Sequence, residues 1–355
     1  MRAGSLPRQR ERFAISLPTL IGVPQENSSS IRTDCSARGP ARHDRTIGLV
    51  INVNSITAVP TRVIQLAGAA QGTINMVSKV WFITGTSKGF GRVWAEAALA
   101  RGDRVAATAR DVRTLAPLVG RYGQQVAAIT LDVTDKAAVN AAIAKANALF
   151  GRLDVVINNA GYGLFGAIEE VSEAEARAQI ETNLFGALWV TQAALPIMRT
   201  QGSGHIIQIS SIGGVNAFPT IGLYHASKWG LEGFSQSLAA EVAGFGIKVT
   251  IVEPGGFATE WGGPSAKRAT QMSAYQGARA AIAVFRSHNV PGDPEATGPA
   301  MLQVVDAKDP PLRIFFGSGG LPMTRAEYAR RIETWEKWND LSLEAQGDLM
   351  AKQAR

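Results

Sequence analysis

Residues 80–91 read VWFITGTSKGFG, a strand-like run that passes directly into a glycine-rich turn. The run at 80–84 is short and mostly apolar, as in a strand buried on both faces. Gly85, Gly89 and Gly91 lack a Cβ, so the backbone of the turn can approach a diphosphate at the N-terminus of the helix that follows. The spacing departs from the usual Gly-x-Gly-x-x-Gly pattern and also suits an ordinary glycine turn. Its place between the first strand and a helix favours a nucleotide site.

Strand-like apolar runs alternate with helical stretches from Lys79 onward. The runs are continuous, which is typical of a parallel sheet with helices on both faces. The sequence therefore predicts an α/β fold with a doubly wound seven-stranded parallel sheet (a Rossmann fold), and ligands at the carboxyl ends of the strands. The expected strands are residues 80–84, 104–109, 126–131, 153–158, 205–210, 247–252 and 312–316, with amphipathic helices at, for example, 136–150 and 226–243.

Composition excludes several classes of protein. The chain has 355 residues, 46% of them hydrophobic, and a net charge of +7. Residues 1–75 contain nine Arg and no Lys against four acids, so most of that charge lies outside the predicted sheet and a nucleic-acid surface is not supported. No apolar run reaches the ~18 residues that a membrane helix needs. The single cysteine, Cys35, fits a reducing compartment, and we expect a cytoplasmic protein.

No metal site is expected. The four histidines lack Cys or carboxylate partners at the spacing of metal ligands. They are His43, His205, His225 and His288.

The chain divides into three parts. Residues 1–75 show no sustained periodicity and predict a disordered N-terminal extension. Met76 leads straight into the first strand, so a mis-called start is an alternative, and the Arg-rich beginning also resembles a transit peptide. Residues 76–320 are expected to form one NAD(P)-binding catalytic domain. Residues 321–355 predict a helical tail whose tryptophans, Trp335 and Trp338, pack on the domain or at a subunit contact.

Tyr224 and Lys228 are separated by one helical turn, and Ser211 precedes them at the end of a predicted strand. Positions i and i+4 share a helix face, so the ammonium can lie against the phenol and make it easier to ionise. Bringing a tyrosine from a pKa near ~10 to neutral pH requires about 3 to 4 kcal/mol, which a partly desolvated cation can supply together with a cofactor charge. An ordinary amphipathic helix is the alternative reading of this spacing. A hydroxyl, a phenol and an ammonium together can move a proton beside a carbonyl.

The end of the second predicted strand, Arg110-Asp111, bears on the choice of cofactor. An acid at this point accepts the ribose hydroxyls of NAD, whereas a base favours the 2′-phosphate of NADP. Arg110 comes first and Lys88 in the glycine turn favours the same phosphate, so we expect NADP(H), with NAD(H) possible because of Asp111. We expect Asp132 at the end of the third strand to accept from the adenine amine, with a plain turn former as the alternative.

The chain resembles the short-chain dehydrogenase/reductase family in its ~250-residue form, closely over residues 79–259. The resemblance rests on six motifs in order: Thr84-Gly85-x-x-x-Gly89-x-Gly91, Asp132, Asn158-Asn159-Ala160-Gly161, Asn183, Ser211 with Tyr224-x-x-x-Lys228, and Pro254-Gly255.

The resemblance implies a catalytic tetrad. Tyr224 would be the general acid or base, Lys228 would depress its pKa and bind the nicotinamide ribose, and Ser211 would hold the substrate oxygen. Asn183 would position a water for proton relay. The cofactor contacts expected from the turn, the strand ends and the resemblance are Gly85, Ser87, Lys88, Gly89, Phe90, Gly91, Arg110, Asp132, Val133, Asn159, Tyr224, Lys228, Pro254, Gly255, Phe257 and Thr259.

A mobile lid over residues 261–272 and an apolar pocket complete the expected site. The pocket residues are Tyr162, Phe165, Phe218, Phe257 and Trp261. They favour a small apolar ketone, aldehyde or secondary alcohol as substrate. By resemblance, helices near residues 183–198 and 228–243 would pair the chain into a homodimer or homotetramer.

The main alternative to an enzyme is a redox sensor that binds NADP(H) without turnover, although a sensor does not need Ser211, Tyr224 and Lys228. The four-residue spacing of Tyr224 and Lys228 disfavours an enoyl reductase. The glycine spacing and the lack of a second substrate domain disfavour a sugar-nucleotide epimerase.

Overall fold

The computed structural model describes residues 78–263, 265–287 and 290–347. The expectations for residues 1–75, including a start at Met76, and for the last eight residues of the tail lie outside the described residues.

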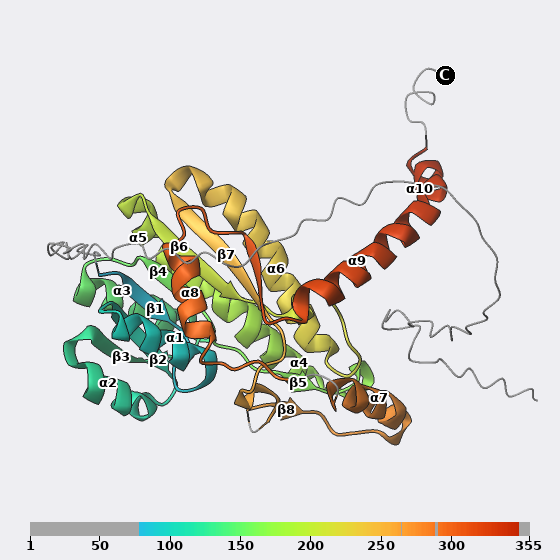
Figure 1. Cartoon of the computed structure of the whole chain (residues 1–355), viewed down its shortest axis with the longest axis horizontal. Helices are drawn as coiled ribbons and strands as arrows, with labels where there is room; N and C mark the ends of the chain where they lie inside the picture. The colour runs from blue at the N-terminus through green and yellow to red at the C-terminus, as the bar shows by residue number, and fades with distance from the viewer. Residues whose placement is uncertain (1–77, 264, 288–289, 348–355) are drawn as a thin grey trace, which may run out of the picture.

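Seven parallel strands form one sheet in the order β3-β2-β1-β4-β6-β7-β9 (Figure 1). Every expected strand is present, with ends that differ by at most two residues. The order reverses direction between β1 and β4, so the crevice that binds ligands in doubly wound sheets lies at the ends of these two strands. The strands are β1 (Val80–Ile83), β2 (Arg104–Ala109), β3 (Val126–Thr130), β4 (Val155–Asn158), β6 (Gly204–Ile209), β7 (Ile247–Pro254) and β9 (Arg313–Phe316).

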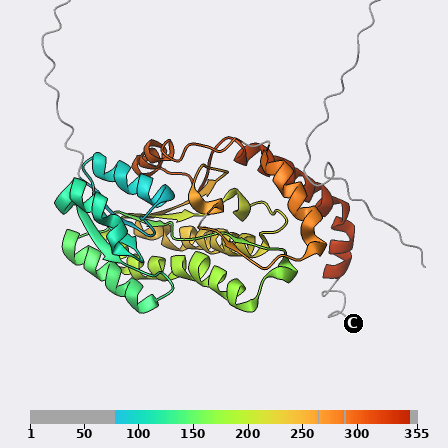
Figure 2. The ribbon, with the colours of Figure 1, turned by 90° about the horizontal axis from the view of Figure 1, so that it is seen from below.

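Helices cover both faces of the sheet, which Figure 2 shows between its two helical layers. Along β1, Trp81 and Ile83 enter the core under α1 and α8, whereas Val80 and Phe82 enter the core under α3 and α5. Burial on both faces explains the continuous apolar runs of the sequence. The helices of the body are α1 (Gly89–Ala100), α2 (Ala116–Tyr122), α3 (Lys136–Phe150), α4 (Glu173–Ile180), α5 (Gly186–Gln201), α6 (Gly222–Val242) and α8 (Thr297–Asp306).

A small second sheet lies beyond the carboxyl end of the main one. It pairs β5 (Leu164–Phe165) with β8 (Lys267–Arg268), and α7 (Gln276–Ser287) follows β8. The segment expected as a lid is therefore anchored by a two-residue strand pair.

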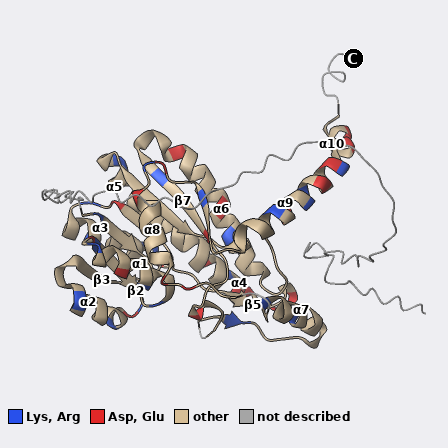
Figure 3. Cartoon of the chain, in the orientation of Figure 1, with Lys and Arg blue, Asp and Glu red and all other residues tan. Residues whose placement is uncertain are grey.

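The C-terminal tail forms α9 (Gly320–Lys337) and α10 (Asn339–Gln346), which run away from the body in Figure 1. Figure 3 shows that acidic and basic residues follow one another along α9. Near the start of α9, Thr324 accepts a hydrogen bond from Asn216. In the second half of the helix, Arg331 stacks over Trp229 of α6. Trp335 and Trp338, expected to pack, are 65% and 58% exposed in this chain. No helix among the described residues is long and apolar enough to cross a membrane.

Candidate active site

The glycine turn between β1 and α1 is held by Asn159 from the end of β4. The Asn159 Nδ2 donates to the carbonyl oxygens of Thr84 at 2.9 Å and Gly85 at 3.0 Å. A Cβ on Gly91 would lie 2.5 Å from both the Asn159 Nδ2 and the Gly85 oxygen, which is closer than real Cβ contacts. Gly85 and Gly89 have φ of 70° and 59°, the left-handed region that favours glycine. The sequence predicted Asn159 as a cofactor contact, and its amide here shapes the turn.

The N-terminus of α1 fits a diphosphate. Lys88 occupies the N-cap position without a side-chain cap, and the first turn of the helix contains no acid. The first N–H groups of the helix therefore lack the side-chain acceptor that usually caps them. A Cβ on Gly89 would meet no atom within 4 Å, so the turn is open on that side. Together the bare helix end and the open turn match the chemistry of a dinucleotide phosphate.

At the end of β2, Arg110 is exposed, whereas the carboxylate of Asp111 is hydrogen-bonded to Arg113. Asp111 accepts from the Arg113 backbone N–H at 3.0 Å and pairs with its guanidinium at 2.8 and 2.9 Å. These hydrogen bonds from Arg113 lower the pKa of Asp111. Arg110 is exposed and has no ion pair within the described part of the chain.

The other predicted cofactor residues lie around the same edge of the sheet. Lys88 forms an ion pair of 2.5 Å with Glu260, which links the glycine turn to the loop after β7. Phe257 of that loop meets Phe90 of α1 edge to face at 5.1 Å. The Thr259 hydroxyl accepts from the Trp261 N–H at 3.4 Å.

The remaining contacts predicted at this edge have backbone or packing partners. Asp132 accepts from the backbone and hydroxyl of Thr134. Val133 and Pro254 are buried, and the Gly255 N–H donates to the Phe316 carbonyl at 2.9 Å. Ser87 is partly buried in the turn.

Tyr224 and Lys228 share one face of α6, as their spacing predicted. The Lys228 Nζ lies 5.9 Å from the centre of the Tyr224 ring and donates to the Ile209 carbonyl at 2.7 Å. Ser211 follows β6, where its hydroxyl accepts from the Gly213 N–H at 3.0 Å. The structure therefore brings these three predicted residues together at the carboxyl end of β6.

The sequence predicted that Tyr224 would ionise more easily than a free tyrosine, and this prediction is wrong for the chain itself. Burial raises the pKa of Tyr224 to about 12, and the Ser211 hydroxyl opposes this only in part. Burial also lowers the pKa of Lys228 to about 8. Both groups are desolvated, and desolvation favours the uncharged form of each.

Asn183 lies in a single π-helical turn, Glu181–Phe185, between α4 and α5. Its side chain accepts from the Tyr162 N–H at 3.1 Å and donates to the Tyr162 carbonyl at 3.0 Å and the Ser227 hydroxyl at 3.2 Å. A Cβ on Gly161 would lie 3.1 Å from the Asn183 Oδ1 and 3.8 Å from the Lys228 Nζ. Asn183 is thus close to Lys228, and its amide fastens the segment after β4. Such π turns frequently occur at functional sites.

One of the predicted pocket residues, Trp261, lies over Tyr224, and a second, Phe165, packs against Trp261. The ring of Trp261 is 4.8 Å from that of Tyr224, and the ring of Phe165 is 5.4 Å from that of Trp261. Phe218 packs instead near His225 at 5.5 Å. Tyr162 is partly buried, and burial raises its pKa.

Sequence reasoning missed a buried acidic pair behind Lys228. Glu232 follows Lys228 by one more helical turn, and Glu253 is the last residue but one of β7. The two glutamates are 5% and 1% exposed. Arg313 of β9 lies 2.9 Å from Glu232 and 3.6 Å from Glu253. Burial and the neighbouring carboxylate raise the pKa of Glu253 to about 8, and burial raises the pKa of Glu232. The spacing from Lys228 to Glu232 was the available signal, whereas Glu253 gave none. In the described residues, His, Cys, Asp and Glu form no group of three that could hold a metal ion.

Comparison with known proteins shows to which family the chain belongs. The family described as short chain dehydrogenase matches residues 79–285. The chain belongs to the short-chain dehydrogenase family. The oxidoreductase BOA17 of Botryotinia fuckeliana is 42% identical over 271 residues, which cover 75% of this chain and 99% of that relative.

Solved short-chain dehydrogenase structures agree. One from Streptomyces avermitilis has a TM-score of 0.72 and 39% identity, covering 77% of this chain and 100% of its own. An alcohol dehydrogenase from the archaeon Thermococcus sibiricus, complexed with 5-hydroxy-NADP, has a TM-score of 0.58 and 26% identity, covering 68% and 97%. These findings confirm the predicted family, the Rossmann fold and the class of enzyme, an oxidoreductase acting on CH–OH groups with a nicotinamide cofactor. The roles of individual residues stay predictions.

Proposed function

We propose that this short-chain dehydrogenase uses NADP(H) to interconvert an apolar secondary alcohol and its ketone, or an alcohol and its aldehyde, with Tyr224 as the general acid or base. One observation supports the proposal most strongly. Three side chains, those of Tyr224, Lys228 and Ser211, lie close together at the carboxyl end of β6, on the same edge of the sheet as the glycine turn. When bound, the nicotinamide supplies or accepts the hydride.

The protein residues would handle the proton. With a pKa of about 12, the Tyr224 phenol is protonated at neutral pH and suits the donation of a proton to a carbonyl oxygen. Ser211, beside it, would hold that oxygen as negative charge develops. Lys228, with a pKa of about 8, is held by the Ile209 carbonyl one helical turn from Tyr224 and would bring positive charge to the phenol. Asn183, whose amide fastens the segment after β4 close to Lys228, would position a water that connects Lys228 to solvent for proton relay.

The preference for NADP(H) over NAD(H) follows from the end of β2. The Asp111 carboxylate is occupied by Arg113, while Arg110 lacks a carboxylate partner in the described chain. An unpaired guanidinium suits a 2′-phosphate, and an acid already used as a cap is a poor acceptor for ribose hydroxyls. The NADP derivative bound to the Thermococcus sibiricus relative is in line with this preference.

Apolar rings favour an apolar substrate. Trp261 lies over Tyr224 and Phe165 packs against Trp261. Gly163 leaves room for the Trp261 indole, since a Cβ there would lie 2.7 Å from it. The pairing of subunits through α5 and α6 stays a prediction, as does the cytoplasmic location.

Binding of NADPH and NADH to the full chain tests the cofactor assignment, with Arg110→Gln as the variant. We expect tighter binding of NADPH, and a dissociation constant for NADPH that rises about tenfold or more in the variant because a charge-assisted hydrogen bond is lost. Binding of NADH should not change. Arg177→Gln, an exposed change of equal charge on α4, is the control.

A panel of apolar ketones and aldehydes tests turnover. NADPH oxidation with at least one of them supports the enzyme. Tight NADPH binding without turnover of any carbonyl or alcohol would favour the alternative, a redox sensor of the same fold.

A further inference from the structure

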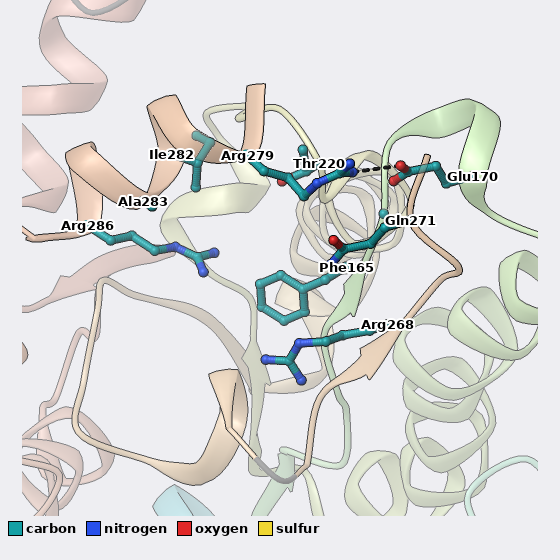
Figure 4. A pocket seen from close by; sticks show the side chains of 10 residues that line it. Phe165, Glu170, Thr220, Arg268, Gln271, Arg279, Ile282, Ala283 and Arg286 are labelled. Atoms are coloured by element: carbon teal, nitrogen blue, oxygen red, sulfur yellow. Dashed lines mark hydrogen bonds and ion pairs between the residues drawn. The ribbon is translucent and has the colours of Figure 1, made fainter. Parts of the chain in front are cut away.

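A basic recess lies beside the aromatic cover of Tyr224. Its volume is about 420 Å³, and its walls come from β5, β8, α7 and the segments around them (Figure 4). Three arginines line it, namely Arg268 of β8 and Arg279 and Arg286 of α7. Figure 3 shows β8 as a basic strand at this end of the molecule.

Two of these arginines enclose one aromatic ring. The guanidinium carbons of Arg268 and Arg286 lie 5.2 and 5.1 Å from the centre of the Phe165 ring. In Figure 4 both side chains reach toward Phe165, one from β8 and the other from α7. Stacking on a ring holds a guanidinium while leaving the N–H groups at its edge able to donate.

The charge of the third arginine, Arg279, is neutralised by a carboxylate. Arg279 forms an ion pair of 2.6 Å with Glu170, whose side chain is fully buried. Among the described residues, Arg268 donates to two backbone carbonyls, those of Gly262 at 2.7 Å and Gly263 at 3.4 Å. Neither Arg268 nor Arg286 has a carboxylate partner within the described residues.

Two neighbouring cations without a counter-charge are costly. Burial, and to a lesser degree the charge of Arg268, lowers the pKa of Arg286. An anion bound between the two guanidiniums would remove the repulsion and accept hydrogen bonds from both.

The recess adjoins the candidate active site. Phe165 forms part of its wall and contacts Trp261, and Trp261 contacts Tyr224. The path from the phenol to the two arginines therefore passes two aromatic rings. An elongated substrate with its carbonyl at Tyr224 would place its far end in the recess and its apolar middle along Trp261 and Phe165.

We propose that Arg268 and Arg286 bind an anionic group, a carboxylate or a phosphate, at the far end of an apolar carbonyl substrate. This inference rests on the proposed function for the position of the carbonyl, and it narrows the substrate class from apolar carbonyl compounds to those with a terminal anion.

Binding without turnover tests the site directly. Decanoate, decyl phosphate and decanol are titrated by calorimetry into the full chain and into Arg268→Gln, Arg286→Gln and the control Lys267→Gln. Lys267 is the exposed neighbour of Arg268 in β8, so its variant removes the same charge. We expect at least one anion to bind about tenfold or more tightly than decanol, and each arginine variant to lose that advantage while Lys267→Gln keeps it. The two anions distinguish a carboxylate site from a phosphate site.

Turnover then tests the link to the active site. Wild type should reduce 9-oxodecanoate with a higher kcat/KM than its methyl ester, and Arg286→Gln should lose this preference through KM while still reducing the ester. Anions that bind no more tightly than decanol, or arginine variants that bind them as wild type does, would overturn the anion site. Arginine-dependent anion binding without reduction of either ketone would support the site and contradict the proposed function, so the two failures are distinguishable. Circular dichroism of each variant checks folding.

Discussion

The ring of Trp261 lies 4.8 Å from the ring of Tyr224, with an angle of 60° between their planes. Trp261 comes from the loop after β7 and Tyr224 from α6, so a residue of the expected lid covers the expected proton donor. Tyr224 is 5% exposed, and this burial raises its pKa to about 12. Burial disfavours the ionised phenol, and the Trp261 ring is part of the cover that excludes water from it.

Trp261→Ala should let water reach the phenol and lower the pKa of Tyr224 toward the ordinary value near ~10. Alcohol oxidation needs the ionised phenol, so the midpoint of its pH–rate profile should move about 1 to 2 units lower than in wild type. Trp335→Ala, a change at an exposed tryptophan of α9, is the control. A profile that keeps its midpoint in Trp261→Ala would show that this ring does not set the pKa.

Gly91→Ala should damage the glycine turn. Its Cβ would lie 2.5 Å from the Gly85 carbonyl oxygen and from the Asn159 amide nitrogen. The backbone at Gly85 could move away from this Cβ only at a cost in free energy. We expect a loss of about 1 to 3 kcal/mol in the free energy of unfolding and NADPH binding weakened about tenfold or more. The control is Gly120→Ala in α2, where a Cβ meets no atom within 4 Å and should slightly stabilise the helix. Urea unfolding and cofactor titration measure both effects, and equal stability of Gly91→Ala and wild type would refute the tight turn.

Glu260→Gln should release Lys88 from its ion pair. Because the pair is about half exposed, it is worth about 0.2 to 1 kcal/mol, so the dissociation constant of NADPH should fall by at most about fivefold. NADH, which lacks the 2′-phosphate, should bind as before. A larger gain for NADH than for NADPH would mean that Lys88 does not face that phosphate. Glu173→Gln, which breaks an exposed pair on α4, serves as the control.

Glu253→Gln should change how stability depends on pH. In the folded chain the pKa of Glu253 is raised from 4.5 to about 8. The contribution of the protonated carboxyl to the free energy of unfolding is therefore fully present below pH 4.5 and is lost as the pH rises through 8. Gln keeps the neutral shape at every pH. The variant should therefore gain stability relative to wild type between pH 5 and 8, by about 1 to 3 kcal/mol at the upper end. Urea unfolding at both pH values tests this, with Glu173→Gln as a control whose difference from wild type should stay flat.

The fold was predictable because each main strand is buried on both faces. Val80 and Phe82 point into one core and Trp81 and Ile83 into the other, which leaves a continuous apolar run in the sequence. The two-residue strands β5 and β8 gave no such signal, because their pairing joins Leu164 to Lys267 across a long stretch of chain.

The site was predictable where local spacing decides geometry. One helical turn places Tyr224 and Lys228 on the same face of α6, and strand ends bring Ser211 and the glycine turn to one edge. The pKa of Tyr224 was not predictable, because it depends on burial, to which the Trp261 ring contributes, and on the Ser211 hydroxyl that opposes it in part. The same holds for Glu253 and for Arg286, whose environments arise only from tertiary packing.

The proton role of Tyr224 is tested most directly by Tyr224→Phe, assayed for NADPH-dependent reduction of the best ketone from the panel together with NADPH binding. The account predicts a kcat lower by about 10² to 10⁴-fold with a dissociation constant for NADPH near that of wild type, because only the proton donor is removed. Reduction by Tyr224→Phe at the wild-type rate would contradict it.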